Sequence, residues 1–265
     1  MPQLSAALRT PAAFLSGGII GTLGGLIGLG GAEFRLPILI TLFRFGALEA
    51  VILNKAMSLI VVATALPFRM GAVPMADLAA EWPVIVNLLA GSLAGAWFGA
   101  GWATRLRSDI LFKVIAALIA GIAVVLLTGH GVASGAAFVT GAAQIVLGVV
   151  AGFAIGIVAA LMGVAGGELL IPTLVILFGA DIKLAGSLSL AVSLPTMLVG
   201  FARYSRDQAF ATLGRNRIFV AVMAAGSIAG SFLGGHLLGL VPEAVLLPGL
   251  ALILVISAFK VWQHK

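Results

Sequence analysis

The sequence predicts an all-α integral membrane protein built as an inverted repeat, with about five membrane segments per half and broken helices at the glycine–proline motifs. The composition, an internal repeat and the placement of basic residues predict it. Of the 265 residues, 62% are hydrophobic and 9% are charged, and the mean hydropathy is +1.22. A soluble domain carries roughly 25% charged residues. The chain is therefore expected to lie in a bilayer, and its apolar runs of about 20 residues have the length of spanning helices rather than barrel strands.

The chain repeats itself at a constant offset. A glycine-rich motif over 24–37, containing Glu33 and Pro37, returns over 159–172 with Glu168 and Pro172, an offset of 135 residues for both pairs. The alignment extends through both halves without a gap. Such self-similarity is typical of a duplicated chain. We therefore expect a first membrane repeat over 1–129 and a second, inverted one over 138–265.

Each half divides into five apolar segments, the second of which is short. They lie near 11–30, 36–45, 48–68, 82–104 and 109–128, and near 138–165, 171–180, 184–203, 217–239 and 243–262. Segments 36–45 and 171–180 are short for about 30 Å of hydrocarbon. Each is expected to begin at its proline, which suits a first helical turn. Each short segment then forms a broken hairpin with the segment before it, and whether that hairpin re-enters or crosses stays open.

Glycines at every fourth position mark the fourth segment of each half. They are Gly91, Gly95 and Gly99, and in the second half Gly226, Gly230 and Gly234. Small residues on one face let helix backbones approach closely in lipid. We interpret both stripes as packing surfaces rather than as ligand sites.

Basic residues predict the orientation. The loop at 103–109 carries Arg105 and Arg107, whereas its repeat equivalent near 238–244 has no Lys or Arg. The other equivalent loops also carry opposite bias, so the positive-inside rule places the halves upside down to one another with both termini in the cytoplasm. The net charge of +6 thus reports topology, and no nucleic-acid partner is expected.

Matched broken helices in an inverted duplication are typical of a secondary transporter with its site at the midplane. A broken helix exposes N–H groups at its N-terminus, and an anion there gains hydrogen bonds and the favourable end of the helix dipole. Glycine at 30, 31, 166 and 167 permits the turn and lets a ligand approach the backbone. The pattern therefore predicts a permease for a small anion, working by alternating access.

The two motifs also resemble those of a known family. Gly28-Leu29-Gly30-Gly31 followed by Pro37, and Gly163-Val164-Ala165-Gly166-Gly167 followed by Pro172, are similar to the glycine–proline signatures of the sulfite exporter (TauE/SafE) family. The resemblance covers almost the whole chain. It implies a multi-pass permease of the bacterial inner membrane that moves a small sulfur anion such as sulfite or an organosulfonate. The chain departs from the common family pattern by carrying glutamate at 33 and 168.

Glu33 and Glu168 are the sharpest candidates for function. Intramembrane carboxylates are costly and usually face a cavity or a partner. If the repeat symmetry brings them together, one is expected to be protonated near neutral pH, as a proton-coupled carrier requires. In the alternative interpretation each carboxylate caps a nearby helix N-terminus, and Arg35 neutralises Glu33.

Arg35 of the first motif and polar residues of the third and eighth segments complete the predicted site. Arg35 and Lys55 have no basic counterparts in the second half, and asymmetric cations suit a single anion. Two polar positions are matched between the repeats, Asn54 with Ser189 and Ser58 with Ser193. They are either interhelical hydrogen-bonding groups or ligand donors. The predicted substrate-binding residues are Gly30, Gly31, Glu33, Arg35, Asn54, Lys55, Ser58, Gly166, Gly167, Glu168, Ser189 and Ser193.

No catalytic chemistry is expected. The three histidines are isolated, and no nucleophile–base pair has a recognisable spacing. Cysteine is absent, and neither a metal-ligand cluster nor a nucleotide-binding motif is evident, so no cofactor or metal is predicted. The expected partners are the small anion, the lipid bilayer and protons as the coupling ion, and a homodimer stays open. A passive anion channel, or a permease for an unrelated small solute, is the alternative function.

Overall fold

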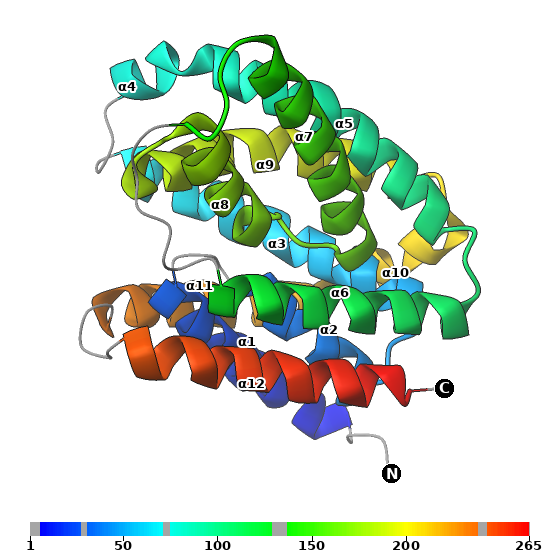
Figure 1. Cartoon of the computed structure of the whole chain (residues 1–265). Helices are drawn as coiled ribbons and strands as arrows, with labels where there is room; N and C mark the ends of the chain where they lie inside the picture. Colours follow the sequence, from blue (N-terminus) through cyan, green and yellow to red (C-terminus); the bar gives the residue numbers. More distant parts are fainter. Residues whose placement is uncertain (1–5, 28–30, 71–74, 129–136, 238–242, 265) are drawn as a thin grey trace.

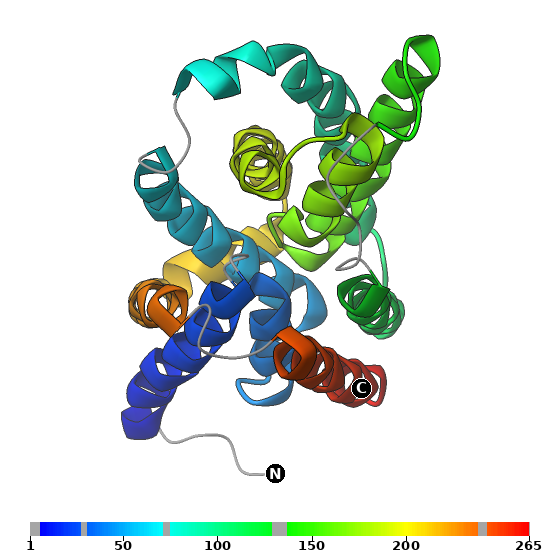
Figure 2. The same cartoon turned by 60° about the vertical axis from the view of Figure 1, so that its left-hand side comes forward.

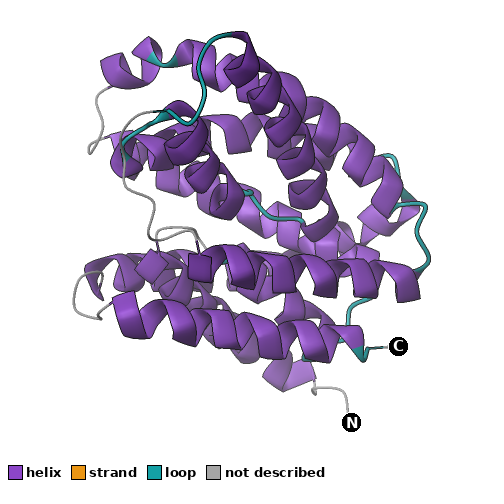
Figure 3. Ribbon diagram, viewed as in Figure 1, coloured by secondary structure: helices purple, strands orange, loops and turns teal. Residues whose placement is uncertain are grey.

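The computed structural model describes every residue except 1–5, 28–30, 71–74, 129–136, 238–242 and 265. Regular structure in the described residues is helical throughout, with no strand (Figure 3). Six helices there are long and apolar enough to cross a membrane by length and composition: 47–64, 82–103, 108–125, 142–162, 184–204 and 217–234. Shorter apolar helices cover 167–178 and 248–262. The prediction of an all-α chain with multiple apolar membrane segments is confirmed.

The helices follow the predicted segments closely. In the first half they are α1 (Ala6–Ile27), α2 (Ala32–Thr41), α3 (Ala47–Met70), α5 (Trp82–Ala103) and α6 (Ser108–Thr128). In the second they are α7 (Ala142–Met162), α8 (Gly167–Phe178), α9 (Ile182–Tyr204), α11 (Arg217–Leu237) and α12 (Glu243–Trp262). Three short elements were not predicted: α4 (Met75–Ala80), the 3₁₀ helix η2 (Gln208–Phe210) and α10 (Ala211–Arg215).

The short helices begin earlier than expected. We predicted that Pro37 and Pro172 would start them, but both prolines lie inside α2 and α8. The chain instead turns at Gly31, with φ of 72°, and at Gly166, with φ of 83°, a left-handed conformation that suits glycine. This earlier start places each motif glutamate in the first helical turn. The prolines cannot donate a hydrogen bond to the carbonyl four residues before, so the intrahelical ladder is interrupted within each short helix.

The glycine stripes pack helices in pairs. Helix α5 lies along α7, and α1 lies along α11. A Cβ atom on Gly95 would overlap the carbonyl oxygen of Phe153, and one on Gly230 would overlap that of Gly18. Glycines of the facing helices make equally close approaches: Gly152 and Gly156 on α7, and Gly17 and Gly21 on α1. The predicted packing role of the stripes is confirmed.

The two helix pairs, α5 with α7 and α1 with α11, are related by the repeat offset. Helix α7 is the equivalent of α1 and α5 is the equivalent of α11, so the offset exchanges one pair for the other. The pairs lie on opposite sides of the molecule (Figure 2), with α3 packed on α9 between them. Helices α6 and α12, also equivalent, lie side by side, and α6 begins at the end of the molecule where α12 ends (Figure 1). Each glycine-packed pair joins a helix of the first half to one of the second, so the halves interleave.

Basic segments gather at one end of the molecule. The loop after α5, helix α10 and the end of α12 all lie there (Figure 1), and they carry Arg105, Arg107, Arg215 and Lys260. Helix α4, with the acidic Asp77, lies at the opposite end.

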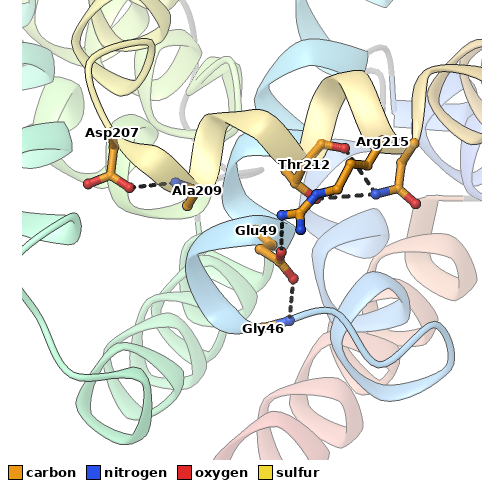
Figure 4. A network of polar contacts seen from close by, with 7 residues as sticks. Gly46, Glu49, Asp207, Ala209, Thr212 and Arg215 are labelled. Carbon is orange, nitrogen blue, oxygen red and sulfur yellow. Dashed lines mark hydrogen bonds and ion pairs between the residues drawn. The ribbon is translucent and has the colours of Figure 1, made fainter.

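A polar network at the basic end joins the two halves. Arg215 of α10 forms an ion pair of 3.3 Å with Glu49 in the first turn of α3 (Figure 4). Glu49 also accepts a hydrogen bond from the N–H of Gly46 at 3.4 Å, and Asp207 accepts one from the N–H of Ala209 at 2.9 Å. These groups are exposed or only partly buried, so the network is a surface feature and not a ligand site.

We predict that Gly95→Val destabilises the fold, because its side chain must displace the backbone of α7. Overpacking of this kind costs about 1–3 kcal/mol. The apparent melting temperature in detergent, followed by loss of the monodisperse chromatographic peak, should fall by several degrees. Gly121→Val on α6 is the matched control, since no atom lies within 4 Å of a Cβ there. An equal loss in both variants would show that helix propensity, and not close packing, causes the effect.

Candidate functional site

Four charged side chains are buried among the described residues. The exposed fraction is 1% for Glu33, 0% for Arg35, 0% for Lys55 and 7% for Glu168. Burial of a charge is costly unless it is paired, hydrogen-bonded or used by a ligand. All four belong to the repeated motif or to α3, which packs on α2, α7 and α9. The centre of the molecule is therefore the candidate site.

The structure brings the two glutamates together. Each lies in the first turn of its short helix, and the Glu168 carboxyl group interacts electrostatically with that of Glu33. Both carboxyl oxygens of Glu33, and Oε2 of Glu168, are buried without a hydrogen-bond partner among the described residues. Two buried carboxyl groups this close cannot both carry a charge without strong repulsion.

Arg35 is surrounded by neutral acceptors. One terminal nitrogen, Nη1, donates to Asn54 Oδ1 and to Ser58 Oγ, both at 3.2 Å, and Nη2 donates to Ser227 Oγ at 3.3 Å. Its Nε atom is buried without a partner in the described part of the chain. The ion pairs found there, Arg107–Asp109 and Arg215–Glu49, do not include Arg35. Arg35 acts on Glu33 through its charge but does not form an ion pair with it.

Asn54 links the two broken hairpins. Its Nδ2 atom donates to the carbonyl oxygen of Ala32, at the start of α2, and to that of Met162, at the end of α7, both at 3.0 Å. Its Oδ1 atom accepts from Arg35. One amide side chain of α3 therefore bonds to α2, to the end of α7 and to the Arg35 guanidinium.

Lys55 is directed to the second hairpin and not to Arg35. Its Nζ atom donates to the carbonyl oxygen of Ala159 at 2.8 Å and to that of Val164 at 3.3 Å. These carbonyls flank the left-handed turn at Gly163 that ends α7. The ammonium thus satisfies backbone acceptors at a helix C-terminus, where a cation is favoured by the helix dipole.

The equivalent positions of the second half have different chemistry. Ser189, the counterpart of Asn54, donates to Gly186 in its own helix at 2.8 Å. Ser193, the counterpart of Ser58, is buried, and its Oγ atom has no partner among the described residues. Leucines at 170 and 190 replace Arg35 and Lys55. The cationic part of the site therefore lies on the first-half helices alone.

The glycines of the prediction fall at the helix starts. Gly31 caps α2, Gly166 caps α8, and Gly167 is the first residue of α8. The first N–H groups of a helix have no intrahelical acceptor, so both turns present donors at the centre of the molecule. Gly30 lies outside the described residues.

The sequence prediction missed several polar groups of the core. Ser227 of α11 accepts from Arg35, Ser92 of α5 is hydrogen-bonded to Thr196 at 2.7 Å, and Tyr204 donates to the carbonyl oxygen of Ala160 at 2.9 Å. Ser92 and Ser227 are repeat-matched, which was a usable signal, but their glycine neighbours favoured a packing interpretation. No group of three or more acidic or histidine side chains in the described residues could hold a metal ion.

Residues 13–261 match the family model described as Sulfite exporter TauE/SafE. No curated protein and no solved structure matches the chain. The family match covers all of the candidate site residues.

We predict that Asn54→Ala is far more damaging than Ser189→Ala. The first change removes the side-chain donor from the carbonyl of Met162 at the end of α7, takes a second donor from that of Ala32, and leaves Arg35 with one acceptor fewer. Each buried polar group left unpaired costs about 1–3 kcal/mol. Ser189 bonds only within its own helix, so its loss should cost about 0.5 kcal/mol or less. Thermal unfolding of the two purified variants measures the difference, and equal melting temperatures would contradict the bridging role of Asn54.

Proposed function

Because the chain belongs to the sulfite exporter TauE/SafE family, we propose that it is a secondary transporter for a small sulfur-containing anion, such as sulfite or an organosulfonate. The family is one of multi-pass membrane transporters and not of enzymes. In this proposal the anion crosses the inner membrane by alternating access around a site between the two broken hairpins. The observation that carries the proposal is the buried Arg35 guanidinium, which has only neutral oxygen partners among the described residues.

A guanidinium of this kind suits an oxyanion. It presents planar N–H donors that match two oxygens at once, and it stays charged under all physiological conditions. Hydrogen bonds to one asparagine and two serines orient it without neutralising its charge. The Nε–H group remains available to a ligand. A sulfite or sulfonate group, with its oxygens on one sulfur atom, has the charge and the acceptors that this cation lacks.

The helix starts support the same ligand. The N-termini of α2 and α8 supply N–H donors and the positive ends of two helix dipoles. Ser193 supplies a buried hydroxyl without a partner in the described part of the chain. The proposed anion-binding residues are Gly30, Gly31, Arg35, Asn54, Ser58, Gly166, Gly167, Ser189 and Ser193, with Glu33 and Glu168 as the coupling pair beside them. Lys55 contributes positive charge from the end of α7 rather than a direct contact.

Charge balance gives the glutamate pair a role in coupling. The buried ionisable groups described are two cations, Arg35 and Lys55, and two acids, Glu33 and Glu168. With both acids ionised the site is neutral and has little attraction for an anion. A single proton on the glutamate pair gives the site one net positive charge, which one bound anion then neutralises. Proton and anion would therefore load together, and the gradient of one would drive the other.

The proposed moving bodies differ from the two sequence halves. Buried residues of α5, α7, α8 and α9 form one apolar cluster, which contains Leu88, Ile155, Leu174 and Val192. The repeat offset relates these helices to α11, α1, α2 and α3, which pack on one another in the same way. We propose that these two sets of four helices rock against each other in an inverted-repeat arrangement. The opposite directions of α6 and α12 (Figure 1) and the gathering of basic segments at one end support that topology.

We predict that Arg35→Gln lowers initial uptake of the transported anion into proteoliposomes by at least about 100-fold, because the buried guanidinium is lost. Sulfite, thiosulfate and small sulfonates are tested with and without a pH gradient. Glu33→Gln and Glu168→Gln should each abolish stimulation by the gradient, because with one acid removed the site already holds one net positive charge and binds the anion without a proton.

Arg217→Gln and Glu49→Gln, which change residues outside the buried site, are the matched controls and should transport as wild type does. If both glutamate variants still show gradient-stimulated uptake, Glu33 and Glu168 do not couple transport to protons. Anion flux in wild type that never exceeds the electrochemical equilibrium would indicate a passive channel. Absence of uptake of every sulfur anion would exclude the proposed substrate class.

We predict an inverted topology with the basic end in the cytoplasm. The chain has no cysteine, so single-cysteine variants need no altered background. Thr140→Cys should react with a membrane-impermeant maleimide in spheroplasts, whereas Ser108→Cys should react only after the membrane is permeabilised. Both side chains are exposed, so the difference reports sidedness. The reverse pattern would show that the basic end lies outside the cell. Labelling of both variants from outside would contradict the proposal that the two residues lie on opposite sides of the membrane.

A further inference from the structure

The C-terminal end of α7 lies inside the protein and is capped by side chains from other helices. The last carbonyls of a helix lack the usual intrahelical donors and carry a partial negative charge. Here the N–H groups of Gly163 and Val164 bond back to Ala160 and Ala159, and side chains add further donors. Tyr204 donates to Ala160, Asn54 donates to Met162, and Lys55 donates to Ala159. Two of these donors are neutral, whereas the lysine, when protonated, brings a full positive charge. The lysine therefore does more than satisfy a hydrogen-bond acceptor.

The surroundings of the Lys55 ammonium resemble a coordination shell. The chain turns at Gly163, with φ of 68°, and the N–H of Val164 bonds back to the carbonyl of Ala159 at 3.1 Å. This turn brings the carbonyl oxygens of Ala159 and Val164 to the same nitrogen, at 2.8 and 3.3 Å. The side chain is fully buried and has no ion pair in the described part of the chain. Backbone carbonyls at an unwound helix end are the ligands that hold monovalent cations in transporters with broken helices.

We propose that Lys55 is a tethered cation: its ammonium occupies a monovalent-cation site made by the carbonyl oxygens of Ala159 and Val164. A lysine ammonium is a compact point charge with three donors and no acceptor, so it can stand where a sodium, potassium or ammonium ion would be coordinated. The protein then carries its own cation at the second hairpin and needs none from solution. This inference does not depend on the identity of the transported anion.

The neighbouring backbone supports a fitted position for the ammonium. A Cβ atom on Gly163 would overlap the carbonyl oxygen of Val51 on α3, so α3 and the end of α7 are held in close contact. Gly200 of α9 faces the lysine tip, since a Cβ there would lie 3.6 Å from Cε and 3.7 Å from Nζ of Lys55. Loss of the long side chain would leave a space beside the two carbonyls. An ion can refill that space.

The test is cation rescue of Lys55→Ala. The melting temperatures of purified proteins are measured in choline, sodium, potassium and ammonium chloride at equal ionic strength. Wild type should melt at the same temperature in all four salts. Lys55→Ala should melt lower in choline and recover roughly 5–10 °C in at least one of the small cations, at about 100 times its Kd. Lys55→Met should be destabilised and should not recover, because its side chain fills the space that the ion needs.

Leu190→Ala, at the repeat-equivalent position, controls for general salt effects and should show no selective response. A Lys55→Ala response no larger than that of Leu190→Ala, for every cation, would overturn the proposal. Lys55→Ser removes the charge and, because its side chain is short, leaves the space beside the two carbonyls open to an ion. A melting temperature equal to that of wild type in this variant would also overturn it, whereas a loss recovered by cations would support it. This second variant decides the matter if Lys55→Ala cannot be purified in folded form.

Discussion

The structure depends on one constraint: a helix that breaks inside a membrane protein must have its free backbone groups satisfied by the protein, water or a ligand. Two helices break here, at the turns around Gly31 and Gly166. At the end of α7 the protein supplies the donors itself, from Asn54, Lys55 and Tyr204. At the starts of α2 and α8 the glycine caps supply no side-chain partner. The carbonyl end of α7 is therefore satisfied by side chains of other helices, whereas the starts of α2 and α8 have glycine caps, and the proposed anion would lie against those starts.

The frame of the molecule is symmetric, but its chemistry is not. The repeat offset relates the helices, the glycine contacts and the two glutamates, whereas leucines occupy the positions equivalent to Arg35 and Lys55 in the second half. A symmetric pair of acids beside an asymmetric pair of bases separates two tasks. In the proposed function the acids, which lie where the two short helices start, share a proton, while the bases define one position for one anion. A strictly symmetric site would offer two equivalent positions.

Much of the fold was predictable because a bilayer restricts the options. Helix lengths followed from hydrocarbon thickness, and the close pairing of α5 and α11 with other helices followed from their glycines. The partners did not follow, because a repeat identifies equivalent helices but not their neighbours. The start of α2 was placed at Pro37 because the left-handed turn at Gly31 depends on tertiary contacts with α1. The proximity of Glu33 and Glu168 was expected from the repeat symmetry. The partners of Lys55 could not be predicted, because they are backbone carbonyls, which every residue carries whatever its side chain.

The pairing of α1 with α11 also has a consequence for synthesis in the cell. Helix α1 ends at Ile27 and α11 begins at Arg217, about 190 residues later. At 5–20 residues per second, translation separates them by roughly 10 to 40 s. Throughout that interval the glycine-lined face of α1 has no partner and meets lipid or the insertion machinery. Helix α1 therefore waits for its partner during most of the synthesis of the described chain, and assembly of the transporter depends on a late helix reaching it.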